Sequence, residues 1–511
     1  MIRAQTLVSL LILAQFAGGG ATAEPITAHI ERVETGLRPA IVLGESATEQ
    51  FDLPERMRFY KTPGVSIAVI DNGAIAWARG YGVREAGMAS PVTTDTIFQA
   101  ASISKPVAAI VALRLVEQGN VELDENVNHK LRSWKLPENE FTTEKKVSLR
   151  LLLSHRAGLT DNAGFRGASA KQALPTLREI LETGKWTPAP IRVGFAPGSR
   201  FQYSGGGYCL LEQLLEDVSG KSFPELAREL VFEPVHMTSS SFEQLLPPER
   251  AGRAAVGHGI NGKKLPQNWN LYPATSAAGL WTTPSDLARF SIELQKWKAA
   301  ASSTILSHAM MAEMLSKQGP QDDRDSKAIA LREAFAEQPP PSWALGVGLI
   351  GRPPTRFFHT GSNPGYQCEL QAYLKGGQGA IIMTNGDQGW RLGREILWAI
   401  AKEYQWPDYE YQPEIKKVVQ LSQDDLERFV GRYRVSYSRP SQLILSITRD
   451  GDRLFAQFSD TTHKVLLYPE SGDRCFTIEN AMALRFVKGE TGGFAEVTSD
   501  AGWRAEREAD Q

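Results

Sequence analysis

The stretch SISKPVAAIVALRLVEQG, residues 102–119, places a hydroxyl and an amine at the start of a long apolar helix. Ser102 and Lys105 are three residues apart, so on a helix they share one face about one turn from each other. Pro106 lacks an N–H and is tolerated only near a helix start, which predicts that the helix begins close to Ser102. The run up to Gly119 is apolar nearly all round, as in a buried helix. A candidate nucleophile therefore lies at a helix N-terminus, within reach of a candidate base.

By itself the Ser-x-x-Lys spacing is a weak signal, because it arises by chance roughly once or twice in a chain of this length. The alternative is a solvated serine and lysine at an ordinary helix N-terminus. A lysine is normally protonated at neutral pH, since its pKa is about 10.4. It becomes a base where burial or a neighbouring cation lowers that pKa, and the apolar helix predicts such burial for Lys105.

Length and composition indicate a globular protein of several domains. The chain has 511 residues, too many for one compact core, which suggests about two or three domains. It is 42% hydrophobic and 22% charged, with a formal net charge of −2 at pH 7. This charge, and the lack of a basic patch interleaved with aromatic residues, argue against a nucleic-acid partner.

The first residues have the pattern of an export signal. Arg3 supplies a positive charge, residues 7–16 form a short apolar segment, and Ala21-Thr22-Ala23 is a small-residue cleavage site. The apolar segment is too short to span a bilayer, and no later segment is long enough. We expect a signal peptide cut after Ala23 and a periplasmic or secreted protein. An uncleaved anchor is the alternative.

Cysteines and metal ligands give no sign of a further chemical role. Cys209, Cys368 and Cys475 are too few for a disulfide framework, and the sequence leaves open whether two of them pair. No cluster of cysteines and histidines has metal-ligand spacing, so we expect neither a metal nor another cofactor.

Strand patterns occur at both ends of a region dominated by helical patterns and loops. Asp71-Asn72-Gly73 joins the first two strand-like runs and predicts a hairpin. Strands at both ends with helices between them imply one antiparallel sheet closed by distant segments, with a helical insertion. The strand-like runs are residues 65–70, 74–81, 366–374 and 379–384, and the clearest helical patterns are residues 149–153, 208–218, 284–297 and 392–404.

The C-terminal part follows two polar segments. Residues 319–341 are polar and contain prolines, which predicts a mobile loop, and residues 405–413 form a linker. Beyond the linker, short strand-like runs alternate with turn signals at residues 450–452, 471–473 and 491–493. This spacing predicts a small β-barrel or sandwich.

Two further motifs complete the pattern that Ser102 begins. FQYSGGGY (residues 201–208) is a glycine-rich loop that opens a helix and presents Tyr203, and FHTGS (residues 358–362) precedes a strand. In this order the three motifs resemble the serine β-lactamase and penicillin-binding-protein superfamily. The nearest resemblance is to its class C β-lactamase-like branch, which includes carboxylesterases, D-aminopeptidases and DD-carboxypeptidases. The resemblance spans roughly residues 63–404.

The resemblance implies an α+β fold of the β-lactamase/transpeptidase type, with an antiparallel sheet flanked by helices and an all-helical insertion. It also implies that the small all-β barrel at the C-terminus is lipocalin-like. We therefore expect a signal peptide over residues 1–23, a serine hydrolase domain over residues 24–410, and a barrel domain over residues 420–511.

The resemblance also implies catalytic roles. Ser102 would be the nucleophile and Lys105 its base. Tyr203 would relay a proton to the leaving group and help to activate water. The backbone N–H groups of Ser102 and Ser362 would form the oxyanion hole. Thr360 and neighbouring residues of the FHTGS motif would bind substrate.

Within the motifs, this chain departs from the family's β-lactamases at two positions. Gly205 stands where those enzymes have an asparagine whose amide contacts the substrate, and losing such a hydrogen bond costs about 1–3 kcal/mol. His359 stands before Thr360 and Gly361 where those enzymes have a lysine, so a substrate carboxylate would meet a weaker cationic partner. His155 is expected to satisfy a local hydrogen bond.

Both departures alter recognition and leave the acylation machinery intact. We expect an exported serine hydrolase acting on a small-molecule or peptide substrate. The favoured type is a peptidase or amidase of D-aminopeptidase, carboxypeptidase or linear-peptide type. A carboxylesterase or weak β-lactamase is an alternative, and a non-hydrolytic penicillin-binding sensor or binder is an alternative of another class. The sequence contains no information on oligomeric state.

Overall fold

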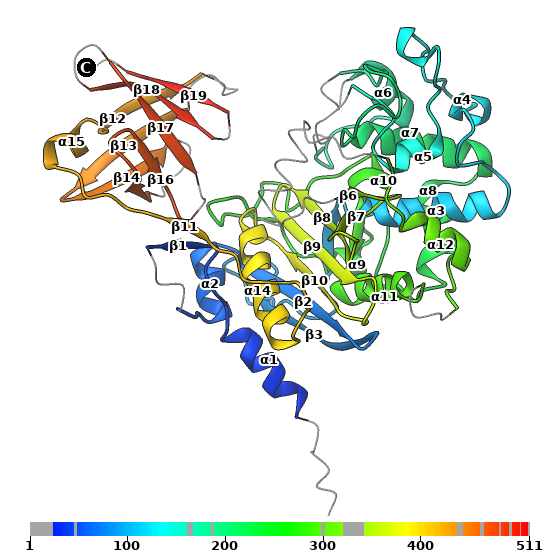
Figure 1. Cartoon of the computed structure of the whole chain (residues 1–511), viewed down its shortest axis with the longest axis horizontal. Coiled ribbons are helices and arrows are strands. Elements are labelled where there is room, and N and C mark those ends of the chain that lie inside the picture. The colour runs from blue at the N-terminus through cyan, green and yellow to red at the C-terminus, as the bar shows by residue number, and fades with distance from the viewer. Residues whose placement is uncertain are drawn as a thin grey trace, which may run out of the picture.

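A computed structural model of the chain contains a body built on a seven-stranded sheet covered by helices, and a barrel (Figure 1). The predicted signal peptide and nearly all of the predicted mobile loop lie outside the described residues. Within the described residues, no helix combines the length and apolarity needed to cross a membrane. The structure describes residues 24–44, 49–160, 167–184, 189–297, 302–319, 342–436, 443–459, 464–479, 482–489, 493–500 and 502–508.

The predicted hairpin is confirmed. Strand β2 (Gly64–Asp71) pairs antiparallel with β3 (Ala74–Gly82). Between them Asn72 has φ 49° and Gly73 has φ 72°. Two consecutive left-handed residues are the conformation that an Asn-Gly hairpin turn requires, which explains why this dipeptide was a reliable sequence signal.

Segments from opposite ends of the body meet in one sheet. Strand β10 (Gly379–Thr384) pairs antiparallel with β2, so Ala380 lies opposite Val69. In the described part of the chain the sheet has seven strands in the order β3-β2-β10-β9-β8-β7-β6, and every pairing is antiparallel. The predicted sheet closed by distant segments is therefore confirmed. The remaining strands are β6 (Ser342–Trp343), β7 (Gly348–Ile350), β8 (Arg356–Asn363) and β9 (Tyr366–Tyr373).

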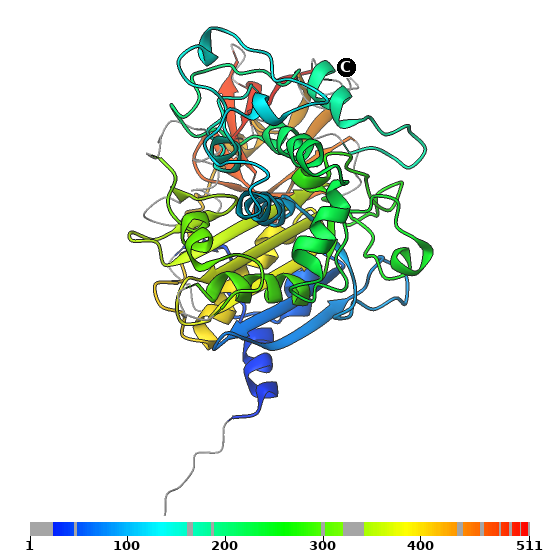
Figure 2. The ribbon, with the colours of Figure 1, turned by 90° about the vertical axis from the view of Figure 1, so that its right-hand side faces the viewer.

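Each face of the sheet buries its own core. Along β2, Val65, Ile67 and Val69 belong to one apolar cluster, and Ala68 and Ile70 belong to another. This alternation is the two-residue period of a strand buried on both faces. The first face packs against α1 (Ile26–Glu34), α2 (Leu53–Phe59) and α14 (Gly389–Glu403), and the second against α11 (Pro284–Gln295) and the helical insertion (Figures 1 and 2).

The helical insertion is built around the helix that the SISK motif opens. This helix, α3 (Ser104–Glu117), has eleven buried residues from Ser104 to Leu115 and so is the buried helix that the sequence predicted. The predicted helices at residues 149–153, 208–218 and 284–297 correspond to α5, α7 and α11. The other helices in and around the insertion are α4 (Val127–Lys130), α5 (Leu149–Leu153), α6 (Leu177–Thr183), α7 (Gly205–Ser219), α8 (Phe223–Ala227), α9 (Pro248–Ala251), α10 (Thr275–Ala278) and α12 (His308–Met314).

The C-terminal region is a closed antiparallel barrel, so of the two predicted architectures the barrel is confirmed. Its first strand pairs with its last, which leaves no free edge among the described strands. The strand before the barrel, β11 (Glu414–Lys416), pairs in parallel with β1 (Ile41–Leu43) near the other end of the chain. The barrel strands are β12 (Gly431–Val435), β13 (Ile444–Asp450), β14 (Arg453–Phe458), β15 (Val465–Pro469), β16 (Arg474–Phe476), β17 (Ala483–Lys488), β18 (Phe494–Ser499) and β19 (Arg504–Arg507).

The structure also answers the question that the sequence left open about disulfides. Cys209, Cys368 and Cys475 all lie in described segments, and each is buried and outside any disulfide bond. The fold is therefore held together without a disulfide among these three thiols.

Candidate active site

A sharp turn between a strand and a helix presents Ser102. Strand β4 (Phe98–Ala101) ends at Ala101, which has φ 48°, a left-handed conformation that is uncommon for a residue with a side chain. Main-chain hydrogen bonds from Ile103 N to Ala100 O (3.0 Å) and from Lys105 N to Ser102 O (3.0 Å) close the turn. Ser102 is half-buried and lies just before α3, where the sequence placed it.

The amine of Lys105 lies beside the Ser102 hydroxyl. Lys105 Nζ is 3.2 Å from Ser102 Oγ and donates a second hydrogen bond, of 2.7 Å, to the main-chain oxygen of Ala277. The lysine is 2% exposed, and its Nζ is 4.9 Å from the centre of the Tyr203 ring. The predicted burial of the Lys105 amine is therefore confirmed, and the amine lies next to the Ser102 hydroxyl.

Tyr203 completes the group from the loop just before α7, which begins at Gly205. A side-chain hydrogen bond joins Tyr203 to Ser102. Burial raises the pKa of the Tyr203 hydroxyl well above its ordinary value, and the hydrogen bond with Ser102 lowers it only in part. The phenol is therefore protonated at neutral pH and can donate a proton.

His155 supports Tyr203 and has the local hydrogen bond that the sequence predicted. Its Nδ1 accepts from the main-chain N–H of Ser204 at 3.1 Å, and its ring lies 4.3 Å from the Tyr203 ring, centre to centre. Trp343 of β6 packs against both rings, with centres 5.2 Å and 5.9 Å away. The tyrosine is held by aromatic packing on two sides.

Strand β8 passes close to the nucleophile turn because Gly361 has no side chain. A Cβ atom at Gly361 would lie 2.1 Å from Ala100 O. Asn363 Nδ2 of β8 donates to Gln99 Oε1 of β4 at 3.1 Å, and Cys368 Sγ of the neighbouring β9 donates to Gln99 O at 3.2 Å. The backbone that carries the predicted substrate-binding residues is thus fixed against the backbone that carries Ser102.

Gly361→Ala is expected to lower kcat/KM by about 10- to 100-fold, because the added Cβ must push β8 away from β4, and displacements of about 1 Å cost this much. The measurement is steady-state kinetics together with thermal unfolding. Gly472→Ala is the matched control, since a Cβ at Gly472 meets nothing within 4 Å. Wild-type kcat/KM in Gly361→Ala would show that the close approach is dispensable.

His359 is neutral in this environment. It is 2% exposed, and its Nδ1 lies 2.7 Å from Thr360 O, so Nδ1 carries the proton. Burial, together with the nearby Lys105 amine, lowers the pKa of His359 to about 3. No atom of the described residues hydrogen-bonds its buried Nε2. The sequence predicted a weaker cationic partner for a substrate carboxylate, and the structure takes this further, since the imidazole has no charge at neutral pH.

The other predicted positions lie at the edges of this group. Gly205 is the first residue of α7 and is buried, with Ser204 as the helix cap accepting from Gly207 N at 2.8 Å. Thr360 is half-buried and Ser362 exposed, both on β8. Their roles, and that of the Ser362 N–H in an oxyanion hole, stay predictions.

Sequence reasoning missed Ala277 and Trp343. Ala277 contributes a main-chain oxygen, which no side-chain motif can signal. Trp343 lies on a two-residue strand outside the three motifs, and only the sheet order brings it against His155.

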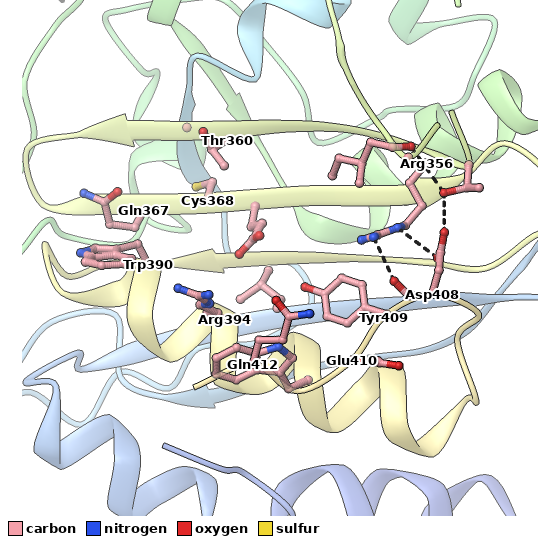
Figure 3. A pocket seen from close by; sticks show the side chains of 18 of the residues that line it. Arg356, Thr360, Gln367, Cys368, Trp390, Arg394, Asp408, Tyr409, Glu410 and Gln412 are labelled. Atoms are coloured by element: carbon pink, nitrogen blue, oxygen red, sulfur yellow. Dashed lines mark hydrogen bonds and ion pairs between the residues drawn. The ribbon is translucent and has the colours of Figure 1, made fainter. Parts of the chain in front are cut away.

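A cavity of about 460 Å³ lies on the far face of the substrate-binding strand, between β8–β10 and α14 (Figure 3). Thr360, Gly361 and Ser362 line one end of it, and Arg356 lies at the other end, 3.6 Å from Asp408. Its described lining does not include Ser102, Lys105 or Tyr203. The cavity and the predicted active site therefore both border on β8, but the three reacting residues are not among the described residues that line the cavity.

Known proteins resemble this chain in both sequence and fold. The family model described as Beta-lactamase matches residues 53–405. Penicillin-binding protein 4* of Bacillus subtilis (strain 168) is 23% identical over 439 residues, which cover 83% of this chain and 90% of that protein.

Two solved structures have a similar fold. The octameric penicillin-binding protein homologue from Pyrococcus abyssi has a TM-score of 0.54 at 22% identity and covers 89% of this chain and 98% of that chain. The D-amino acid amidase from Ochrobactrum anthropi SV3 complexed with L-phenylalanine has a TM-score of 0.54 at 19% identity, covering 74% and 98%. At these identities the two structures bear on the fold alone.

Proposed function

Because this chain belongs to the Beta-lactamase family and is a serine hydrolase of that family, we propose that it cleaves amide or ester bonds through an acyl-enzyme on Ser102. One observation carries the proposal: Lys105 Nζ lies 3.2 Å from Ser102 Oγ, and Tyr203 hydrogen-bonds to the same hydroxyl. A nucleophile, a base and a proton donor thus converge on one atom.

The acylation step begins from the form in which Lys105 has released its proton to solvent: this amine takes the proton of Ser102 while Oγ attacks the substrate's carbonyl carbon. The carbonyl oxygen becomes an oxyanion, which the main-chain N–H groups of Ser102 and Ser362 stabilise. Collapse of this intermediate breaks the bond to the leaving group, and Tyr203 supplies the proton that the departing nitrogen or oxygen needs. Lys105 returns its proton to Tyr203, so no net charge accumulates.

Deacylation repeats the same chemistry with water as the nucleophile. Tyr203 and Lys105 together take a proton from water as its oxygen attacks the ester carbon of the acyl-enzyme. The Ser102–acyl bond breaks, Ser102 Oγ regains a proton, and the acid product leaves.

The neutral state of His359 supports a substrate without an obligatory carboxylate beside the scissile bond. DD-carboxypeptidase substrates and β-lactams both carry such a carboxylate, whereas amino-acid amides, aminopeptidase substrates and simple esters do not. A charge-assisted hydrogen bond contributes about 1.5–3 kcal/mol, so a site without a cation at this position loses roughly 10- to 100-fold on anionic substrates. We therefore place the activity among amidases, aminopeptidases and esterases.

A matched pair of substrates tests this choice. N-acetyl-D-alanine methyl ester and N-acetyl-D-alanyl-D-lactate have the same acyl part and an ester to cleave, and only the second has a carboxylate. We expect kcat/KM to favour the first by at least about tenfold. An ordinary histidine gains charge as the pH falls, but a group with a pKa of about 3 does not, so the preference should be the same at about pH 6 and pH 8.

A higher kcat/KM on the anionic substrate at both pH values would contradict a neutral His359. A higher kcat/KM on that substrate at the lower pH alone would contradict it as well. His359→Lys supplies the reciprocal arm, because a cation at this position should raise the relative rate on the anionic substrate by about tenfold. If the protein forms a permanent adduct with a penicillin in intact-mass spectra and turns over no member of the panel, it is a binder or sensor instead.

The setting we propose is secreted or periplasmic. It is supported by the leader pattern of residues 1–23, with its charged start, short apolar segment and Ala-Thr-Ala cleavage site.

A further inference from the structure

The amine of Lys105 is held in place by a carbonyl group, and that carbonyl belongs to a short helix. Ala277 O, in α10, accepts the 2.7 Å hydrogen bond from Lys105 Nζ. A four-residue helix has little intrinsic stability, so its position depends on what it is attached to. The direction of the Ala277 carbonyl is therefore decided by the contacts of α10.

Glu212, a buried residue of α7, binds α10 directly. Its Oε1 accepts from Thr275 Oγ1 at 2.5 Å, and its Oε2 accepts from the main-chain N–H of Ser276 at 2.8 Å. Ser276 Oγ in turn donates to Tyr208 O on α7 at 2.8 Å. The two residues that immediately precede Ala277 are thus clamped to α7, the helix that begins two residues after Tyr203.

This carboxylate occupies a costly position. Glu212 is 3% exposed and lies in a helix where Leu211 and Leu215 beside it are buried and apolar. Burial raises its pKa to about 7, and the hydrogen bonds from Thr275 and Ser276 lower the pKa only in part. A leucine, as at Leu211 and Leu215 of the same helix, would avoid the cost of burying a carboxylate but would leave the Thr275 hydroxyl and the Ser276 N–H without their acceptor.

Resting on the proposed function, in which Lys105 is the base, we propose that Glu212 is a positioning residue for that base. Its two oxygens fix Thr275 and Ser276, which aims the Ala277 carbonyl at Lys105 Nζ and keeps the amine beside Ser102. The effect passes through α10, so Glu212 acts without contact with the substrate.

The test compares Glu212→Ala with Glu212→Gln in the full-length protein, using the ester substrate and the rate of labelling of Ser102 by a fluorophosphonate. Glutamine can accept from Ser276 N and donate to Thr275 Oγ1, so it preserves both contacts. We expect Glu212→Ala to lower kcat and the labelling rate by about 10- to 100-fold with KM changed less than about threefold. Glu212→Gln should retain at least about half of the wild-type kcat.

Glu216→Ala is the matched control, since Glu216 lies one turn further along α7 and accepts from Phe223 N at 2.9 Å. It should lower the melting temperature and leave kcat unchanged. Should Glu212→Ala fail to fold, Thr275→Val removes one clamp contact in a side chain of nearly equal shape and should lower kcat by about three- to tenfold.

The inference is overturned if Glu212→Ala and Thr275→Val keep the wild-type kcat, or if Glu212→Gln loses as much activity as Glu212→Ala. Failure of the proposed function looks different: the wild-type protein itself would then neither turn over the ester nor be labelled at Ser102.

Discussion

Ser102→Ala is expected to abolish turnover and covalent labelling together. Without Oγ there is no atom to form the acyl bond, while Lys105 and Tyr203 keep their places. In serine hydrolases whose groups act as a unit, loss of the nucleophile lowers kcat by about 10⁴- to 10⁶-fold. The measurements are kcat on the preferred ester and intact mass after treatment with a fluorophosphonate.

Ser104→Ala is the control that separates chemistry from local structure. Ser104 belongs to the same motif, but its hydroxyl donates to Ala101 O at 2.6 Å and accepts from Leu280 N at 3.0 Å, so its role is structural. This variant should melt at a lower temperature and still be labelled. Labelling that persists in Ser102→Ala would show that the nucleophile has been misassigned.

Lys105→Ala is expected to lower kcat by about 10²- to 10⁴-fold, the usual contribution of a positioned general base. The reason is geometric, since Lys105 Nζ lies 3.2 Å from Ser102 Oγ, the atom whose proton must leave. KM should change far less than kcat, because the amine contacts the nucleophile and Ala277 O rather than the bulk of the substrate.

Lys105→Arg distinguishes a base from a positive charge. A guanidinium group keeps the charge but does not lose its proton at accessible pH, so it cannot act as a base. We expect this variant to be as inactive as Lys105→Ala. Substantial activity in Lys105→Arg would mean that the lysine assists catalysis by its charge alone. Lys221→Ala, at an exposed ion pair with Glu229, serves as the surface control.

Several elements of the fold could be predicted from short sequence patterns because interactions among neighbouring residues determine them. Asp71-Asn72-Gly73 predicted its hairpin because few dipeptides adopt two consecutive left-handed conformations. Pro106 indicated where α3 begins because a proline is tolerated only in the first turn of a helix. The turn spacing in the C-terminal region was compatible with either a barrel or a sandwich. Only the pairing of β12 with β19 decides between them, and these strands are far apart in the sequence.

The sequence motifs predicted which residues form the candidate site, but not the contacts and burial of those residues in the fold. The motifs supplied the hydroxyl, amine and phenol, but the closeness of β8 to β4 depends on a contact between Gly361 and Ala100. The neutral state of His359 depends on burial by residues from several segments, which no single window of sequence contains. Glu212 gave only a faint signal in the sequence, as an acid between two pairs of leucines and a glutamine, and its role could be inferred only with α10 beside it.

The pairing of β2 with β10 has a consequence for how the molecule comes into being on the ribosome. The β2–β3 hairpin leaves the exit tunnel early, yet the strand that covers its apolar edge follows some three hundred residues later. Until then, an uncapped hairpin rich in valine and isoleucine stays exposed to unwanted association. Chains that end before β10 should therefore depend on chaperones, and the sheet can close only after β10 has been made.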